Sequence, residues 1–350
     1  MSNDHVRISL SDAHELAERA CLRAGYAAHH AAAIARTVTA AERDEAVSHG
    51  LFRIPFYIRA LAQAAVSPDA EPVFSDTAPA VIRADARNAF APLTLERGTP
   101  RLALRAREQG VAAMSVVNAY NVAALRPEVE RLAADGLVAM AFTASLSYVA
   151  PAGGTAPLFG TNPMAFGWPR EGAPPVVFDQ ASSASARGEI QVRLRDGRDI
   201  PQGWAVDADG EHTTDPAAAL EGAQLPFGGH KGSAIALMIE LLAGALLGDL
   251  FSFEASQLDA AGTGAPRGGE LIIAMSPKRF VPGAAGAADA AADTPGAGQL
   301  SHAEALFERI LAQDGTRLPG DRRYAARRRS EAEGVSIPRS FYEELRSLAQ

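Results

Sequence analysis

The first part of the chain has the apolar spacing of helices that pack together. Residues 12–25 follow a candidate N-cap at Ser11 and reach Gly25, a residue type that commonly ends a helix. An alanine-rich segment over residues 26–46 and a third pattern over residues 55–65 continue this spacing. Several prolines then interrupt regular structure. We therefore predict a small helical unit at this end of the chain.

The middle of the chain alternates between strand-like and helical segments. Short apolar runs suit buried strands, namely "PAVIRADA", "VAAMSVVNA", "LVAMAFTAS", "PPVVFDQASS" and "GGELIIAMSP". Among them lie the helical segments "LTLERGTPRLALRAREQG" and "LRPEVERLAADG", each of which ends at a glycine. This alternation predicts an α/β fold in which helices cover a sheet.

Composition indicates a folded globular protein. The 350 residues can bury a large core, and 47% hydrophobic with 21% charged residues is ordinary for such proteins. A formal net charge of −8 provides no field that attracts phosphate backbones or anionic membranes, so nucleic-acid binding is disfavoured. The longest apolar run, residues 233–248, is too short for a membrane span and has Glu240 at its middle, so we interpret it as a core helix.

Cysteine content and the opening residues favour a reducing compartment. The single cysteine, Cys21, cannot form an intrachain disulfide, and no Cys/His cluster is present to hold zinc. The opening "MSNDHVRISL" has neither the basic region nor the apolar core of a signal peptide. We therefore expect a cytoplasmic protein with no bound metal.

Several familiar catalytic fingerprints are missing from the sequence. No G-x-G-x-x-G motif follows a strand, so the usual dinucleotide-binding loop is not predicted. Residues 227–233, "FGGHKGS", have the order Lys-Gly-Ser where a P-loop requires Gly-Lys-Ser. Neither H-E-x-x-H nor G-x-S-x-G occurs, which disfavours zinc peptidases and α/β-hydrolases.

The stretch "DEAVSHGLFRIP" places His49, Gly50 and Arg53 where the helical pattern breaks. Histidine can exchange a proton at neutral pH, and arginine can hold a carboxylate through two parallel hydrogen bonds. Gly50 allows other groups to approach closely. Together they suit a small carboxylic acid with a reducible double bond beside the carboxylate. The alternatives are a structural histidine and a surface ion pair of Arg53 with Asp44 or Glu45.

Ser48 precedes the histidine directly. Adjacent side chains on an α-helix diverge by roughly 100°, so Ser48 can hydrogen-bond His49 only where the backbone has left α-helical geometry. Without such a departure, Ser48 is expected to contact substrate or backbone instead.

Three further segments combine polar groups with turns. Residues 159–168, "FGTNPMAFGW", and 178–190, "FDQASSASARGEI", supply short polar side chains and exposed amides that suit a polar ligand, although turns alone explain many of them. Glycines at 228–232 lead into a helix and suit a cofactor phosphate, with a plain helix entry as the alternative. The arginines of residues 317–329 suit an extra phosphate such as the ribose 2′-phosphate of NADPH, or form a solvated face.

These motifs, in this order, resemble the malate/L-lactate/ureidoglycolate dehydrogenase family of NAD(P)H enzymes. The resemblance spans nearly the whole chain through "SHGLFRIP", "FGTNPMAFGWP", "FDQASSASARGEI", "PFGGHKGSAIALMIELLAGALLG" and "RLPGDRR". Segments such as "IPQGWAVDADG" and "GDLFSFEAS" are most similar to the branch that reduces delta-1-piperideine-2-carboxylate and delta-1-pyrroline-2-carboxylate.

The resemblance implies a malate/L-sulfolactate dehydrogenase-like, non-Rossmann α/β fold with a mixed sheet. We expect an N-terminal helical unit over residues 1–75, a central cofactor- and substrate-binding domain over 76–299, and C-terminal helices over 300–350 that pack back on the N-terminal unit. It also implies a homodimer whose active site forms between subunits.

The resemblance further assigns roles to residues. The implied catalytic residues are His49 as proton donor with Ser48 and Glu189. The implied substrate-binding residues are Arg53, Thr161, Arg187 and Gly188. The implied cofactor-binding residues are Asn121, Val122, Ala123, Ala124, Leu125, Asp179, Gln180, Ala181, His230, Lys231, Arg317, Leu318, Pro319, Gly320, Asp321, Arg322 and Arg323.

The leading hypothesis is an NADPH-dependent reductase of small cyclic 2-imino acids, with NADH also possible as the cofactor. One alternative is an NAD(P)-dependent 2-hydroxy-acid dehydrogenase of the same family. Relatives commonly show a Ser-His-His-Phe-like stretch after an asparagine, whereas residues 118–127 here read "NAYNVAALRP". That departure leaves a second alternative, a binding protein that has kept the fold without the chemistry.

Overall fold

A mixed sheet lies at the centre of the protein. The computed structural model describes residues 4–63, 65–122, 124–259, 262, 264–281 and 297–350. Seven strands are hydrogen-bonded in the order β2-β3-β4-β11-β5-β6-β7. Their bounds are β2 Val73–Ala78, β3 Val81–Asp85, β4 Val111–Tyr120, β5 Val138–Thr143, β6 Met164–Trp168, β7 Val176–Gln180 and β11 Arg267–Met275. Strands β3 and β4 are parallel and the other neighbouring pairs are antiparallel, so the mixed α/β sheet that we predicted is confirmed.

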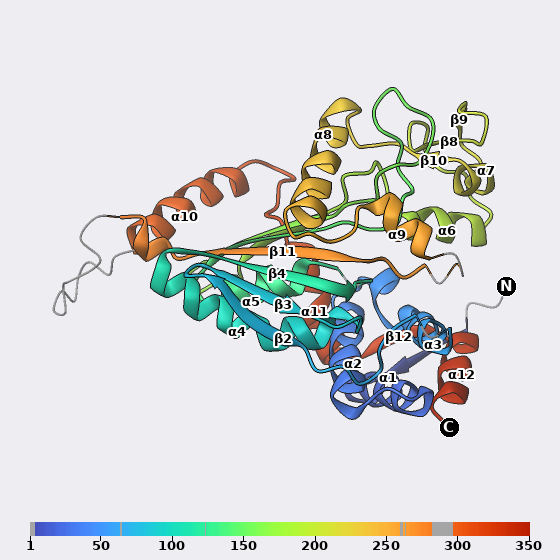
Figure 1. The fold of residues 1–350 in the computed structure, drawn as a ribbon, viewed down its shortest axis with the longest axis horizontal. Helices are drawn as coiled ribbons and strands as arrows, with labels where there is room; N and C mark the ends of the chain where they lie inside the picture. The colour runs from blue at the N-terminus through green and yellow to red at the C-terminus, as the bar shows by residue number, and fades with distance from the viewer. Residues whose placement is uncertain (1–3, 64, 123, 260–261, 263, 282–296) are drawn as a thin grey trace.

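Helices cover both faces of the sheet (Figure 1). One face packs against α4 (Ala91–Gln109) and α5 (Arg126–Ala134) through a core that includes Leu102, Leu132 and Ile272. The other packs against α8 (His230–Ile239), which continues into the π-helix η3 (Glu240–Ala245). The predicted helix is therefore confirmed, but it is not fully buried in the core, because Leu237, Met238 and Leu241 on one side of it are exposed. Helix α9 (Ser252–Leu258) follows it.

The N-terminal unit contains the three predicted helices and also a strand from each end of the chain. Its helices are α1 (Leu10–Ala24), α2 (Ala28–Arg43) and α3 (Ile54–Ala62). Strand β1 (His5–Ile8) pairs with β12 (Val335–Pro338), and α12 (Arg339–Leu348) packs on α1. The N-cap of α1 is Ser9, not Ser11, because Ser9 and Asp12 form a reciprocal capping box; the end at Gly25 is as predicted.

Of the two remaining C-terminal helices, one lies on the central domain, and the other lies between that domain and the N-terminal unit (Figure 1). Helix α10 (Ala297–Leu311) packs beside β7, where Phe307 contacts Val176 and Leu318. Helix α11 (Asp321–Glu333) contacts α2. Residues 300–350 therefore do not all pack on the N-terminal unit as we expected, because the apolar side of α10 is buried against the edge of the sheet.

A small satellite, which the hydrophobic pattern did not predict, lies beyond β7. It contains α6 (Arg187–Arg195), α7 (Pro216–Glu221) and three two-residue strands, β8 (Ala205–Val206), β9 (His212–Thr213) and β10 (Ala223–Gln224). Short 3-10 turns are η1 (Val47–His49), η2 (Leu51–Arg53) and η4 (Pro277–Arg279).

None of the helices that the structure describes has the length and apolarity needed to cross a bilayer.

Candidate active site

The candidate site begins where α2 breaks. The helix ends at Arg43, and Glu45 adopts a left-handed φ of 56° that turns the chain away. Two 3-10 turns follow, η1 and η2, with Gly50 between them. Both turns leave α-helical geometry, which is the condition that a bond between Ser48 and His49 requires.

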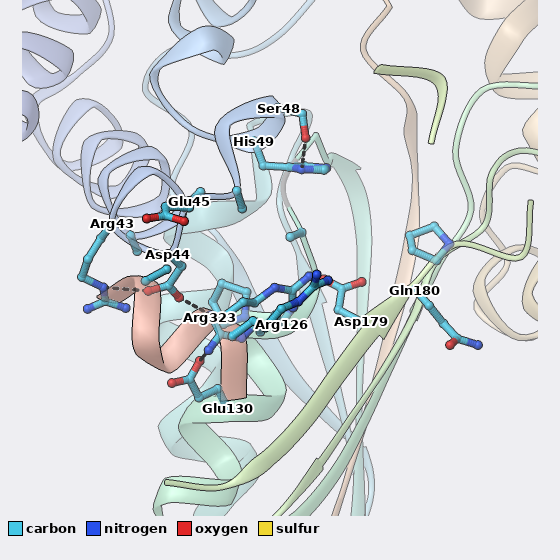
Figure 2. A pocket seen from close by; sticks show the side chains of 18 of the residues that line it. Arg43, Asp44, Glu45, Ser48, His49, Arg126, Glu130, Asp179, Gln180 and Arg323 are labelled. Carbon is cyan, nitrogen blue, oxygen red and sulfur yellow. Dashed lines mark hydrogen bonds and ion pairs between the residues drawn. The ribbon is translucent and has the colours of Figure 1, made fainter. Parts of the chain in front are cut away.

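That bond is present (Figure 2). Ser48 Oγ lies 3.0 Å from His49 Nδ1, within hydrogen-bond distance. The bond fixes the orientation of the imidazole, since one ring nitrogen is held by the neighbouring side chain. The pairing of Ser48 with His49 that the resemblance implied is therefore formed.

Arg53 is attached to the same turn. Its Nε donates to the carbonyl oxygen of Ser48 at 2.7 Å. The surface ion pairs that we considered for Arg53 are wrong, because Asp44 pairs with other arginines and Glu45 pairs with Arg329. In the described part of the chain no ion pair is found for Arg53, and burial lowers the pKa of its guanidinium. A buried cation in this state is suited to an anionic ligand.

The structure requires glycine at position 50 for a reason other than the one that its place in the sequence suggested. A Cβ at Gly50 would lie 2.1 Å from Glu42 Oε2, so the group that approaches this glycine is a buried carboxyl of α2. The same oxygen accepts the backbone N–H of Leu51 at 3.0 Å. The glycine is therefore needed for contact within the protein; room for a ligand is not its reason.

The electrostatics around His49 favour the neutral imidazole. Burial, followed by the charges of Arg53 and Arg323, lowers the pKa of His49 to about 4. At pH 7 the ring is therefore without its second proton before any ligand binds.

His49 and Ser48 border a cavity of about 1090 Å³, which we call the central cavity (Figure 2). The wall opposite them comes from α5, β7 and α11. The predicted site residues that line it are Ser48, His49, Ala124, Thr161, Asp179, Gln180, Ala181, Arg322 and Arg323. Residues that are far apart in the sequence thus meet in one space.

A buried ion network closes one side of the central cavity. Asp44 at the end of α2 pairs with Arg126 of α5 and, through two hydrogen bonds of 2.8 and 2.9 Å, with Arg327 of α11. Glu130 pairs with both arginines at 2.9 and 2.7 Å. Burial opposes the charge of Asp44, but hydrogen bonds from Arg327 and Arg43 prevail and lower its pKa to about 2. The network fixes the helical unit that carries His49 against the domain that carries Asp179.

Three further arginines line the cavity and do not belong to this ion network. Arg131, Arg322 and Arg323 line the cavity, and no ion pair involves them among the residues that the structure describes. Arg323 lies near Asp179, whose pKa burial raises and the Arg323 charge opposes (Figure 2). Free guanidinium groups in a cavity of this volume fit a phosphate-bearing dinucleotide.

A buried polar network holds the turn that contains Thr161. The neighbouring Asn162 donates from Nδ2 to Glu240 Oε1 at 2.7 Å, and Glu240 also accepts the backbone N–H of Ser252 at 2.9 Å. Glu240, the polar residue inside the apolar run, therefore anchors the turn that presents Thr161. The π-helical geometry of η3 begins at this glutamate, a deviation that is frequent near functional sites.

Two predicted substrate residues lie on α6, close to the His49 turn. A Cβ at Gly188 would lie 3.7 Å from Ser48 Cβ. The Arg187 guanidinium stacks on Tyr148, 4.0 Å from the ring centre, and donates to Leu220 O. Glu189 is not brought to Ser48 or His49: it is exposed, and it forms an ion pair with Arg193 at 3.2 Å. The implied assistance of Glu189 is therefore not visible in this arrangement.

Several predicted cofactor residues do not line the central cavity. Asn121 donates to Glu270, Val122 packs against the N-terminal core, and the Leu125 side chain is buried in the core of the sheet. Leu318 is buried beside Phe307, and Asp321 accepts the Leu318 N–H, so these two hold the turn that carries the arginines. The others outside the lining are Arg317, Pro319, Gly320, His230 and Lys231. Ala123 lies outside the described residues.

The lysine and histidine at the start of α8 are nevertheless connected to the cavity wall. Both side chains are exposed, but Gly232 in the same turn packs directly against the carbonyl oxygen of Ser182, close to Gln180 and Ala181. Phe227 N donates to that same oxygen at 3.0 Å. The glycine-rich entry of α8 thus borders the polar segment after β7.

Sequence reasoning missed Arg126, Glu130, Arg327, Glu42 and Tyr148. The spacing of Arg126 and Glu130, four residues apart on a predicted helix, was an available signal. The other three have none, since their roles depend on contacts between elements that are distant in the sequence.

Comparison with known proteins supports a nicotinamide-dependent chemistry. Residues 8–346 match the family model described as Malate/L-lactate dehydrogenase. The chain is 49% identical, over 99% of its length and 100% of the relative's, to the Delta(1)-pyrroline-2-carboxylate/Delta(1)-piperideine-2-carboxylate reductase of Pseudomonas aeruginosa. It is 41% identical, over 98% of its length and 97% of the relative's, to the (2R)-3-sulfolactate dehydrogenase (NADP(+)) of Chromohalobacter salexigens.

A solved structure shows the same fold. The delta1-piperideine-2-carboxylate reductase of Pseudomonas syringae superposes with a TM-score of 0.88 at 40% identity. The match covers 98% of this chain and 99% of that one.

Proposed function

The chain belongs to the malate/L-lactate dehydrogenase family, and we propose that it reduces the C=N bond of small cyclic 2-imino acids, giving cyclic amino acids. Delta-1-pyrroline-2-carboxylate and delta-1-piperideine-2-carboxylate are the substrates, and L-proline and L-pipecolate are the products. The observation that carries the proposal is the His49–Arg53 turn, in which a neutral imidazole shares one short segment with a guanidinium that forms no ion pair among the described residues.

Arg53 binds the substrate carboxylate in this proposal. Its Nε is bonded to Ser48 O, which leaves the two terminal nitrogens of the guanidinium for a ligand, and Arg53 itself is not among the residues that line the central cavity. A carboxylate accepts two parallel hydrogen bonds from such a pair. The carboxylate then lies beside the turn that carries His49, which places the adjacent C=N bond near the imidazole.

His49 holds the proton of the ring nitrogen. With Nδ1 bonded to Ser48, Nε2 is the nitrogen that we assign to the substrate. Because the pKa of His49 is about 4, its ring is neutral at pH 7 and accepts a hydrogen bond from a protonated C=N–H group. The electron pair of the C=N bond moves to nitrogen during reduction, and that nitrogen keeps its proton. A keto acid, by contrast, requires a proton from the protein, so the neutral imidazole favours the imine.

Members of this family use NAD(P)H, which supplies the hydride when bound. We propose NADPH as the preferred cofactor, because Arg322 and Arg323 line the cavity, form no ion pair with any residue that the structure describes, and suit an additional phosphate. Asp179 also contributes: it accepts the backbone N–H of Arg126 at 3.1 Å and so holds the start of α5 against the cavity wall.

The proposal is tested by a side-by-side assay. Oxidation of NADPH and of NADH is followed with both cyclic imines and with pyruvate, oxaloacetate and sulfopyruvate. We expect turnover of the imines with NADPH, and KM for NADH at least about tenfold higher, since a lost charge-assisted contact is worth roughly 1.4 kcal/mol or more. Turnover of the keto acids alone would establish the 2-hydroxy-acid dehydrogenase, and no detectable NADPH binding at millimolar concentration would establish the binding protein.

We also propose that the protein is a cytoplasmic homodimer. Helix α8, η3 and the residue that follows η3 carry an exposed apolar stripe of Leu237, Met238, Leu241 and Leu246, of which Leu241 is 50% and Leu246 65% exposed. Such a contiguous stripe suits a second copy of the chain. Sedimentation equilibrium at micromolar concentration is expected to give the dimer mass, and a monomer mass would contradict the proposal.

A reducing compartment accords with the single buried thiol of Cys21.

A further inference from the structure

The amide groups of the His49–Arg53 turn are satisfied in two ways. His49 N donates to Ala46 O at 2.8 Å, Gly50 N to Val47 O at 3.1 Å, and Arg53 N to Gly50 O at 2.9 Å. Leu51, the first residue of the second 3-10 turn, is fully buried, and its N–H has Glu42 Oε2 as its acceptor at 3.0 Å. A buried N–H without an acceptor is destabilising, so this bond decides how the turn is held.

Glu42 lies in the last turn of α2 and is itself buried, with 4% of its surface exposed. No ion pair with Glu42 is found within the described ranges, in contrast to the paired Asp44 and Glu45 that follow it. Burial raises the pKa of Glu42, and the Leu51 N–H opposes that rise. Within the described residues, the hydrogen-bond partner of this buried carboxyl is the backbone N–H of Leu51, two residues after His49.

Gly50 and Glu42 are matched in shape. A Cβ at Gly50 would lie 2.1 Å from Glu42 Oε2, 3.1 Å from Cδ and 3.3 Å from Cα. Two of these three conflicts disappear if the carboxyl is removed. The carboxyl thus occupies the space that the missing side chain leaves, and it touches the residue directly between the proposed acid-base group and the rest of the turn.

We propose that Glu42 is a positioning residue for the reaction. Its carboxyl fixes the turn that separates His49 from Arg53, and so sets the relative position of the two side chains that bind one substrate. This inference rests on the proposed function of that turn. Glu42 acts through the Leu51 amide and the surface of Gly50 and does not touch the substrate. Its effect follows from geometry, since a misplacement of about 1 Å in a site can lower the rate about 100-fold.

The kinetic test compares Glu42→Ala, Glu42→Gln, Gly50→Ala and the double variant with the wild type. Glu42→Ala is expected to lower kcat/KM for the imine by about ten- to hundredfold, since the turn loses its anchor. Glu42→Gln keeps an oxygen acceptor of the same reach and is expected to stay within about threefold of the wild type. Equal losses in both variants, or a loss below about twofold in Glu42→Ala, would overturn the proposal.

The double variant distinguishes a direct contact between Glu42 and Gly50 from a general loss of structure. Gly50→Ala alone is expected to lower kcat/KM at least about tenfold, because the new Cβ collides with the carboxyl; in the Glu42→Ala background the same change is expected to add less than about threefold. Identical losses in the two backgrounds would show that the residues act independently. Thermal unfolding of each variant, measured in parallel, identifies any variant that has not folded.

A readout that needs no substrate keeps this inference distinct from the proposed function. The ring signal of His49 is followed by NMR against pH and is assigned with His49→Ala. We expect the midpoint to rise from about 4 toward 6.5 in Glu42→Ala, as the loosened turn admits water, and to remain low in Glu42→Gln. An unchanged midpoint in all variants would overturn the positioning role. A shifted midpoint in a protein that reduces no imine would leave that role standing and reject the proposed function.

Discussion

Replacing His49 with alanine is expected to lower kcat on the cyclic imines by about 10- to 150-fold, because a hydrogen bond to a charged group is worth about 1.5 to 3 kcal/mol. The imidazole is the group that Ser48 orients at 3.0 Å and that faces the central cavity. Without it, the protonated nitrogen of the substrate has no acceptor and shifts relative to the cofactor. Steady-state kinetics at saturating cofactor measure the loss, and full activity of the variant would remove His49 from the mechanism.

His49→Gln distinguishes a neutral acceptor from a charged acid. Its amide oxygen accepts a hydrogen bond but takes up no proton, so we expect activity between that of the wild type and that of the alanine variant. The ratio of kcat/KM in the wild type to that in His49→Gln cancels the titration of the substrate itself. Because the pKa of His49 is about 4, this ratio is expected to stay constant from about pH 8 to 5 and to fall only near pH 4. A ratio that rises about tenfold per unit as the pH falls would show that the imidazolium is required.

The inner strands of the central sheet were predictable because both of their faces are buried, whereas the exposed edge strand β2 was not predicted. The runs "LVAMAFTAS" and "GGELIIAMSP" became the adjacent strands β5 and β11, and their continuous apolar character reflects helices packed on each side. The small strands β8, β9 and β10 contain two residues each, which is too short for any hydrophobic period to develop.

The break at the end of α2 was also predictable, but its cause was not. Histidine, glycine and arginine in one short stretch indicated a functional turn, and the geometric condition for the Ser48–His49 bond was met by a 3-10 turn. The reason for Gly50 depends on Glu42, which approaches from the preceding helix. Nothing in the local pattern predicts which buried group fills the space above a glycine.

The ion network shows a further limit. Asp44, Arg126 and Arg327 come from α2, α5 and α11, and only the folded chain brings them together. Sequence alone does not distinguish an arginine that forms ion pairs, such as Arg327, from Arg323, for which no ion pair is found among the described residues. Separating structural from ligand-binding arginines therefore requires the tertiary contacts.

Replacing Arg53 with alanine is expected to cost about 2 to 5 kcal/mol of transition-state binding, because truncating one partner of a buried, hydrogen-bonded charge pair has this effect. The loss corresponds to roughly 30- to 5000-fold in kcat/KM. We expect most of it in KM for the imino acid, since the carboxylate is bound equally before and during reduction. Arg53→Lys keeps the charge without the two-pronged geometry and is expected to lie between the wild type and the alanine variant. KM for NADPH serves as the control and is expected to change little.

A substrate without the carboxylate decides what Arg53 does. The guanidinium also donates to Ser48 O at 2.7 Å, so its removal can act by releasing the turn that holds His49. With 1-pyrroline, the same ring without a carboxylate, the wild type and Arg53→Ala are expected to differ by less than about threefold if the guanidinium binds the carboxylate. An equal loss on 1-pyrroline and on the imino acid would show that Arg53 orients His49 and that the carboxylate is bound elsewhere. Arg187, which is tied to Tyr148 close to the same turn, would then be the next cation to test.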